Sequence, residues 1–227
     1  TPREKSATPR SREICSATST ARVAIQRLSA VEYDNTLRDL VGITSRPSVK
    51  LPPDNFGRVY DNDAAALAGT TPDLVERFVD LSEEIVEEAF TKNRQGIVSC
   101  DPAASSDAKC ASEILGRIAE RAFRRPIAAQ ELSDLVALFS SATPFEQGLK
   151  VAIRAIISDP NFLYRPIAAE RLDGFELAAR LSYFLWRTMP DAELFAAAKA
   201  GSLTKPDVMR RQILRMLSDP RASLAFE

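Results

Sequence analysis

The sequence contains no histidine among its 227 residues. This absence excludes Ser-His-Asp triads, zinc sites with histidine ligands, and general acid–base catalysis by an imidazole. It also excludes a histidine-ligated haem held by this chain alone. Most of the common hydrolytic and redox centres therefore cannot be built from these residues.

Long apolar runs and an excess of one charge are also missing. The longest apolar runs, such as residues 194–198, have about five members, too few for a membrane-spanning helix or a signal-peptide core. Lysine and arginine number 30 against 31 aspartates and glutamates, and the net charge is −1. This balance argues against a nucleic-acid partner, because binders of nucleic acid are usually strongly basic.

Cysteine is scarce, and its spacing excludes two more kinds of site. Only Cys15, Cys100 and Cys110 are present, and none forms a CxxC or CxxCH motif, so a four-cysteine metal site and covalent haem attachment are excluded. Cys100 and Cys110 flank a short polar segment, which predicts a local disulfide and an oxidising compartment. The alternative is two unrelated buried thiols. In either case Cys15 lacks an evident mate.

The distribution of caps and glycines predicts an all-α protein. Ser29 and Glu32 form a capping-box pattern at the start of a helix, and Gly42 follows its end. Thr71 and Pro72 open a helix with a wide apolar stripe, and Asp173 with Glu176 repeats the capping-box pattern. Further helices are expected at about 111–124, 128–140, 145–157, 191–200 and 205–218, with Gly96 and Gly201 as stops and Thr204 and Asp207 opening the last.

These helices are expected to form consecutive small bundles packed into one elongated or compact unit. Residues 1–20 are rich in Ser, Thr, Pro and Arg and predict an extended or disordered lead-in. We divide the rest into helical domains at 21–96, 97–168 and 169–227. The apolar pattern after Pro220 stops within two turns, so the third domain is expected to be truncated and the chain to be a piece of a longer polypeptide.

Oxygen ligands gather in one loop of the first domain. The loop has the sequence DNFGRVYDND and contains Asp54, Asn55, Asp61, Asn62 and Asp63. Hard oxygen ligands at this density suit calcium, although the spacing differs from that of an EF-hand loop, and a structural loop of Asx turns uses the same residues. Two such carboxylates, with Arg58, also raise the alternative of a hydrolase or a calcium-dependent polysaccharide-binding protein.

Charges are segregated although their sum is near zero. Residues 61–88 hold nine acidic residues and one basic residue, whereas Arg117, Arg121, Arg124 and Arg125 cluster on another expected helix. Two solvated faces, or pairing of the two helices inside the fold, would explain this. A basic contact site for an acidic partner or a lipid head group is the functional alternative.

Four consecutive aromatic or apolar residues cover every side of one helical turn. Tyr183, Phe184, Leu185 and Trp186 are consecutive, so they cannot all face a single core. We therefore expect Tyr183, Phe184 and Trp186 to include contacts with another domain or a partner.

Several segments together resemble a known bacterial family. RLSAVEYDNTLRDLVGI followed by LPPDNFGRVYDND resembles the opening of its first domain, and the cysteine segment followed by SDPNFLYRP resembles its second. LDGFELAARLSYFLWRTMPDAEL followed by QILRMLSDPRA resembles the start of its third. The chain is thus similar, over about residues 22–227, to planctomycete-type cytochrome c-associated multidomain envelope proteins, which are mosaics of domains of unknown function.

The resemblance implies a cellular location and a domain architecture, but it implies no reaction. In that family a later module carries the CxxCH motif, so haem c is expected only in a C-terminal part that this sequence lacks, and no residue here is implied as a haem ligand. The implied location is the periplasm or the extracellular side of a bacterial envelope. We interpret the chain as a non-catalytic scaffold or interaction segment that docks to the C-terminal remainder of its own polypeptide or to another envelope redox protein. An enzymatic role is disfavoured but left open.

Overall fold

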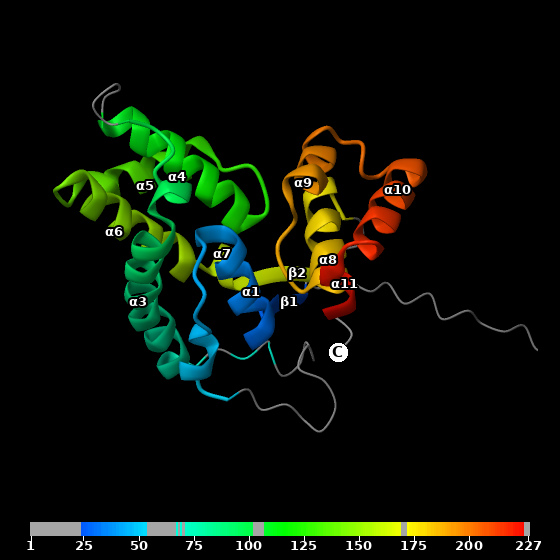
Figure 1. The fold of residues 1–227 in the computed structure, drawn as a ribbon, viewed down its shortest axis with the longest axis horizontal. Coiled ribbons are helices and arrows are strands. Elements are labelled where there is room, and N and C mark those ends of the chain that lie inside the picture. Colours follow the sequence, from blue (N-terminus) through cyan, green and yellow to red (C-terminus); the bar gives the residue numbers. More distant parts are fainter. Residues whose placement is uncertain are drawn as a thin grey trace, which may run out of the picture.

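A computed structural model describes most of the chain, and it is largely helical (Figure 1). The described residues are 24–53, 67, 69, 71–101, 107–168 and 172–224. The predicted all-α class is confirmed, with one small sheet added. The elements are β1 (Ala24–Arg27), α1 (Ala30–Val41), the 3₁₀ helix η1 (Pro47–Lys50), α3 (Pro72–Ile97), α4 (Asp107–Phe123), α5 (Ala129–Ser140), α6 (Phe145–Ser158), α7 (Pro160–Leu163), β2 (Tyr164–Ala168), α8 (Gly174–Trp186), α9 (Ala192–Lys199), α10 (Pro206–Leu217) and α11 (Pro220–Leu224).

Local sequence signals set several helix boundaries as predicted. The Ser29 hydroxyl accepts from the backbone N–H of Glu32, whose carboxylate accepts from the Ser29 N–H, so the capping box at α1 is complete. Gly42 ends α1 with φ of +78°, a conformation that favours glycine. Asp173 and Glu176 close the same reciprocal bonds at the start of α8.

Other boundary predictions were wrong. Gly96 lies inside α3, which runs one residue further to Ile97. α10 begins after Lys205 without a side-chain cap, and the Thr204 hydroxyl donates instead to the carbonyl of Gly201. By contrast, α4 ends at Phe123, within one residue of the expected end at residue 124.

The two-stranded sheet was not predicted from the sequence. β1 pairs antiparallel with β2, and Arg27 lies opposite Tyr164. Because four-residue and five-residue strands carry too few positions for an alternating pattern, their pairing depends on tertiary contacts. The sheet ties the start of the described chain to the segment that follows α7.

The hydrophobic cores do not follow the domain boundaries proposed from the sequence. One core runs through α1, α3, α4, α5, α6 and α7, across the proposed boundary at residue 96, and takes in Tyr183 and Met189 from the third segment. A second core lies among α8, α9, α10 and α11. In Figure 1 the α3–α6 group and the α8–α11 group lie on opposite sides of α1 and the β1–β2 ribbon. The boundaries themselves stay a prediction.

Among the described residues, the acidic side chains of α3 form ion pairs with α6 and η1. Glu83 lies 3.2 Å from Arg154 and Glu87 lies 2.7 Å from Lys150, both on α6. Glu84 pairs with Lys50 of η1. We considered from the sequence that these acidic residues pair with the arginines of the other helix; in the described part of the chain, Lys150, Arg154 and Lys50 take that place. These exposed pairs add little stability each.

We predict opposite effects for two glycine-to-alanine changes inside helices. A Cβ on Gly148 of α6 would collide with the backbone carbonyl of Phe139, so Gly148→Ala should destabilise the fold by about 1–3 kcal/mol. A Cβ on Gly116 of α4 would meet only Leu132, at 3.7 Å, so Gly116→Ala should stabilise it by about 0.5–1 kcal/mol. Urea denaturation measures both; equal effects of the two changes would contradict the packing described here.

Candidate functional site

Some of the site residues predicted from the sequence lie within the described residues, and others lie outside them. Asp54, Asn55, Asp61, Asn62 and Asp63, like Arg58, lie outside the described residues, and the calcium interpretation stays a prediction. Within the described residues, no group of three or more cysteine, aspartate or glutamate side chains is placed to hold a metal ion. No helix in that same part is both long and apolar enough to cross a membrane.

Cys100 and Cys110 are joined by a disulfide, with their Cα atoms 5.8 Å apart. Cys110 is fully buried in the first turn of α4, and Cys100 packs against the same core. The bond therefore fixes the start of α4 relative to the end of α3.

The arginines of α4 bind mainly backbone carbonyls. Arg117 donates to the carbonyl of Ile97 at 2.7 Å, and Arg121 donates to that of Asp39 at 2.8 Å. Burial lowers the pKa of both guanidinium groups. Arg125 instead forms a two-pronged ion pair with Glu131, at 2.7 and 2.9 Å. Most of the donors that the sequence offered to an acidic partner are thus engaged inside the fold.

Arg124 is the most deeply buried of these arginines, with 4% of its surface exposed. Its backbone adopts φ of +57° directly after α4, where the Arg125 N–H donates to the carbonyl of Glu120. This left-handed conformation costs a residue other than glycine about 1–2 kcal/mol. The cost is offset by the position it gives the side chain, which turns inward at the end of the helix.

The guanidinium of Arg124 gathers three backbone carbonyls and one phenol. It donates to the carbonyls of Asn161, Phe162 and Tyr164 at 2.5, 3.0 and 2.9 Å, and to the hydroxyl of Tyr183 at 3.1 Å. No carboxylate is paired with it among the described residues. One cation therefore connects the end of α4 with α7, the start of β2, and α8.

Tyr183 completes this junction from the third segment. The Thr36 hydroxyl donates its only proton to the carbonyl of Glu32, so at 3.0 Å it accepts from Tyr183. The guanidinium of Arg165 lies 5.0 Å from the centre of the Tyr183 ring and pairs with Glu32 at 2.8 Å. We refer to Thr36, Arg124, Arg165 and Tyr183 as the arginine–tyrosine junction.

The structure corrects the expectation that Tyr183 and Arg124 contact a partner. Tyr183 is only 2% exposed, because this face of α8 packs onto α1 and α4. Two more bonds support the same contact: Thr188 donates to Asp39 at 2.7 Å, and the amide of Asn35 donates to the carbonyl of Arg187. Arg187, like Arg124, has a positive φ.

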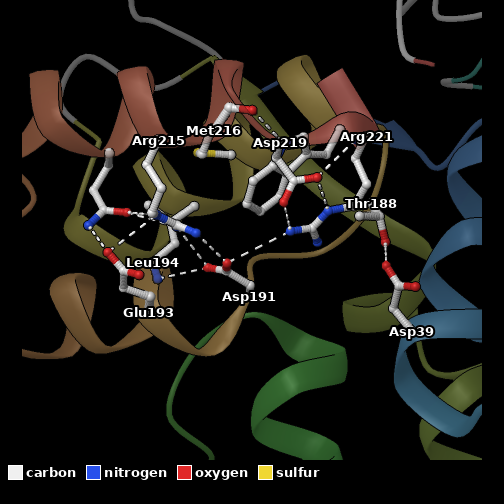
Figure 2. A network of polar contacts seen from close by, with 11 residues as sticks. Asp39, Thr188, Asp191, Glu193, Leu194, Arg215, Met216, Asp219 and Arg221 are labelled. Carbon is white, nitrogen blue, oxygen red and sulfur yellow. Dashed lines mark hydrogen bonds and ion pairs between the residues drawn. The ribbon is translucent and has the colours of Figure 1, made fainter. Parts of the chain in front are cut away.

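Trp186 is likewise buried, and the guanidinium groups of Arg215 and Arg221 lie 5.4 and 3.6 Å from its ring centre. Its indole N–H donates to the carbonyl of Met216. Asp191 binds Arg215 at 2.7 Å (Figure 2). The hydrogen bond from Arg221 lowers the pKa of Asp219 to about 2. The expectation of a partner contact at Trp186 is therefore corrected too, because the indole holds α8 to α10 and α11.

Phe184, unlike Tyr183 and Trp186, is exposed to solvent. It lies between these two buried aromatics and is 70% exposed. Of the three aromatic residues proposed for partner contact, it alone is accessible, because its position on α8 points away from both cores.

A cavity of about 680 Å³ adjoins the junction. Its walls come from β1, α3, the end of α4, α7, β2 and the first turns of α8, and they are mostly apolar. Arg124 and Arg165 contribute to its wall. Sequence patterns indicate neither this cavity nor the roles of Thr36 and Arg165, because each depends on segments far apart in the chain.

We predict opposite outcomes for removing the hydroxyl groups of two buried tyrosines. Tyr183→Phe leaves a buried arginine donor without its acceptor and should cost about 1–3 kcal/mol. The hydroxyl of Tyr33 is buried and has no hydrogen-bond partner in the described part of the chain, so Tyr33→Phe should be neutral within about 0.5 kcal/mol or stabilising. Urea denaturation of both variants measures this difference, and an unaffected Tyr183→Phe variant would contradict the junction.

Comparison with known proteins finds three family matches in succession. Residues 26–91 match PSD3, described as a protein of unknown function (DUF1587), and residues 110–166 match PSD5, described as a protein of unknown function (DUF1595). Residues 172–227 match PSD4, described as a protein of unknown function (DUF1592). No curated protein and no solved structure matches the chain. Successive segments of the chain are thus similar to the DUF1587, DUF1595 and DUF1592 families, in that order.

Proposed function

We propose that this chain is a non-catalytic helical scaffold of an exported, cytochrome c-associated protein. It holds its three domains in one fixed arrangement and docks to a haem-bearing module or a larger redox complex. The observation that carries the proposal is the arginine–tyrosine junction, where buried polar side chains that would be candidates for chemistry serve to join segments.

The buried polar groups of the junction bind other groups of the chain, which supports a scaffold role over a catalytic one. The Arg124 guanidinium binds carbonyls of the chain itself, and Glu32 both caps α1 and pairs with Arg165. Buried and satisfied groups of this kind fix a unique packing arrangement. A chain whose task is to present other modules in a constant orientation needs this rigidity.

The disulfide supports export. A Cys100–Cys110 bond persists in an oxidising compartment and is rare where thiols are kept reduced. The order of the three matched domains also parallels the envelope family that the sequence resembles. We place the protein in the periplasm or on the extracellular side of a bacterial envelope.

Phe184 is the residue of this scaffold that we propose for contact with the haem-bearing module. It is 70% exposed on α8, and α10 adds Leu214 and Leu217 as exposed apolar side chains, at 55% and 50%. Exposed aromatic and aliphatic groups are typical anchors of protein interfaces.

The test is to purify the native protein from its host and record its absorbance spectrum. We expect covalently attached c-type haem, either in the same polypeptide or in a stoichiometric partner. Phe184→Glu should then weaken binding of the haem-bearing module about tenfold or more, as expected for loss of an interface anchor. Val49→Glu is the matched control, because Val49 is 73% exposed on η1, and this change should leave binding unaltered.

Two results would overturn the proposal. One is native protein that carries no haem and co-purifies with no haem protein. The other is turnover of a substrate by the purified chain. This activity must return after the chain has been denatured and refolded, which shows that it belongs to the chain itself.

A further inference from the structure

The cavity beside the arginine–tyrosine junction has walls from all three matched domains. Val75 and Phe78 belong to the first, Phe123 and Leu163 to the second, and Phe175 to the third. Ligand sites occur preferentially at such interfaces, and their volumes are usually about 300–1,000 Å³. The volume of this cavity, about 680 Å³, lies within that range.

The apolar lining continues outward to exposed side chains. Ile25 of β1 and Val75 of α3 both line the cavity, yet they are 53% and 48% exposed. When a ligand covers large aliphatic side chains exposed to this degree, the burial of their apolar surface favours binding. Their position at the cavity indicates a ligand whose apolar body extends from the interior to the mouth.

Positive charge at the cavity is only partly compensated. Four arginines line it, of which Arg125 pairs with Glu131 and Arg165 pairs with Glu32. The acceptors of Arg124 among the described residues are all neutral. Arg180 is exposed on α8 and forms no ion pair within the described part of the chain.

The two acidic residues of the lining already accept hydrogen bonds from the backbone. Asp173 and Glu176 accept hydrogen bonds from each other's backbone N–H groups at the start of α8. There they also face the positive end of the helix dipole, which stabilises negative charge. Arg180 is thus the exposed arginine of the lining whose donors meet no carboxylate among the described residues.

From these observations we propose that the cavity binds an amphipathic carboxylate, with its apolar chain between Val75, Phe78 and Phe175 and its carboxylate on Arg180. An extended aliphatic acid fits both the apolar lining and the guanidinium of Arg180. This binding site adds to the scaffold role and does not depend on it, because it requires no haem and no partner protein.

Isothermal titration with dodecanoate, kept below its critical micelle concentration, tests the proposal. Dodecanoate should bind with one site per chain, and dodecyltrimethylammonium should not bind. Arg180→Gln should weaken binding about fivefold, the effect expected for loss of an exposed ion pair. Arg210→Gln is its control, because Arg210 is exposed on α10 and lies outside the cavity lining.

A second matched pair separates the cavity from the surface in general. Val75→Glu places a negative charge at the mouth and should weaken dodecanoate binding about tenfold, since like charges repel strongly in a partly apolar site. Val79→Glu lies one turn along α3, is similarly exposed at 46% in the unaltered chain, and does not line the cavity, so it should bind like the unaltered protein. Neither valine supports the core, so both variants should fold.

The proposal is overturned if dodecanoate does not bind, or if the neutral dodecanol and the cationic detergent bind as tightly as dodecanoate. Equal effects of Val75→Glu and Val79→Glu would also overturn it, because binding would then be non-specific. The scaffold proposal would survive all of these results, since haem association is measured separately.

Discussion

The buried guanidinium of Arg124 is the contact on which the arrangement of the domains depends. It receives its position from α4 and binds backbone oxygens of α7 and β2, together with the hydroxyl of Tyr183 on α8. A buried charge is costly unless hydrogen bonds surround it, so each of these segments must be in place for the others to be stable. The contact therefore couples elements from the second and third domains, and Thr36 extends it to the first.

This coupling explains why the third domain has its own core and yet a fixed orientation. α8 contributes Tyr183 to the large core on one side and Trp186 to the smaller core on another. Because the two aromatic residues are three positions apart, they lie on adjoining faces of the helix. The cavity adjoins the junction, because Arg124 and Arg165 belong to the junction and also line the cavity.

The sequence predicted what is decided locally. The capping boxes at Ser29 and Asp173, the glycine after α1 and the short spacing of Cys100 and Cys110 all involve residues close in the chain. What it could not predict is decided by partners far away. The acidic face of α3 does not reveal that Lys150 and Arg154 lie opposite, and four consecutive aromatic or apolar residues do not reveal that two cores and solvent share α8. The strands β1 and β2 were missed for the same reason.

The most direct test of the account uses the single tryptophan of the chain. Trp186 fluorescence reports on the α8–α11 group, whereas far-UV circular dichroism reports on all helices. In urea, the two transitions should coincide for the unaltered protein, and Arg124→Met should separate them because it uncouples the third domain from the rest. Transitions that remain coincident in Arg124→Met at an unchanged midpoint would contradict the account.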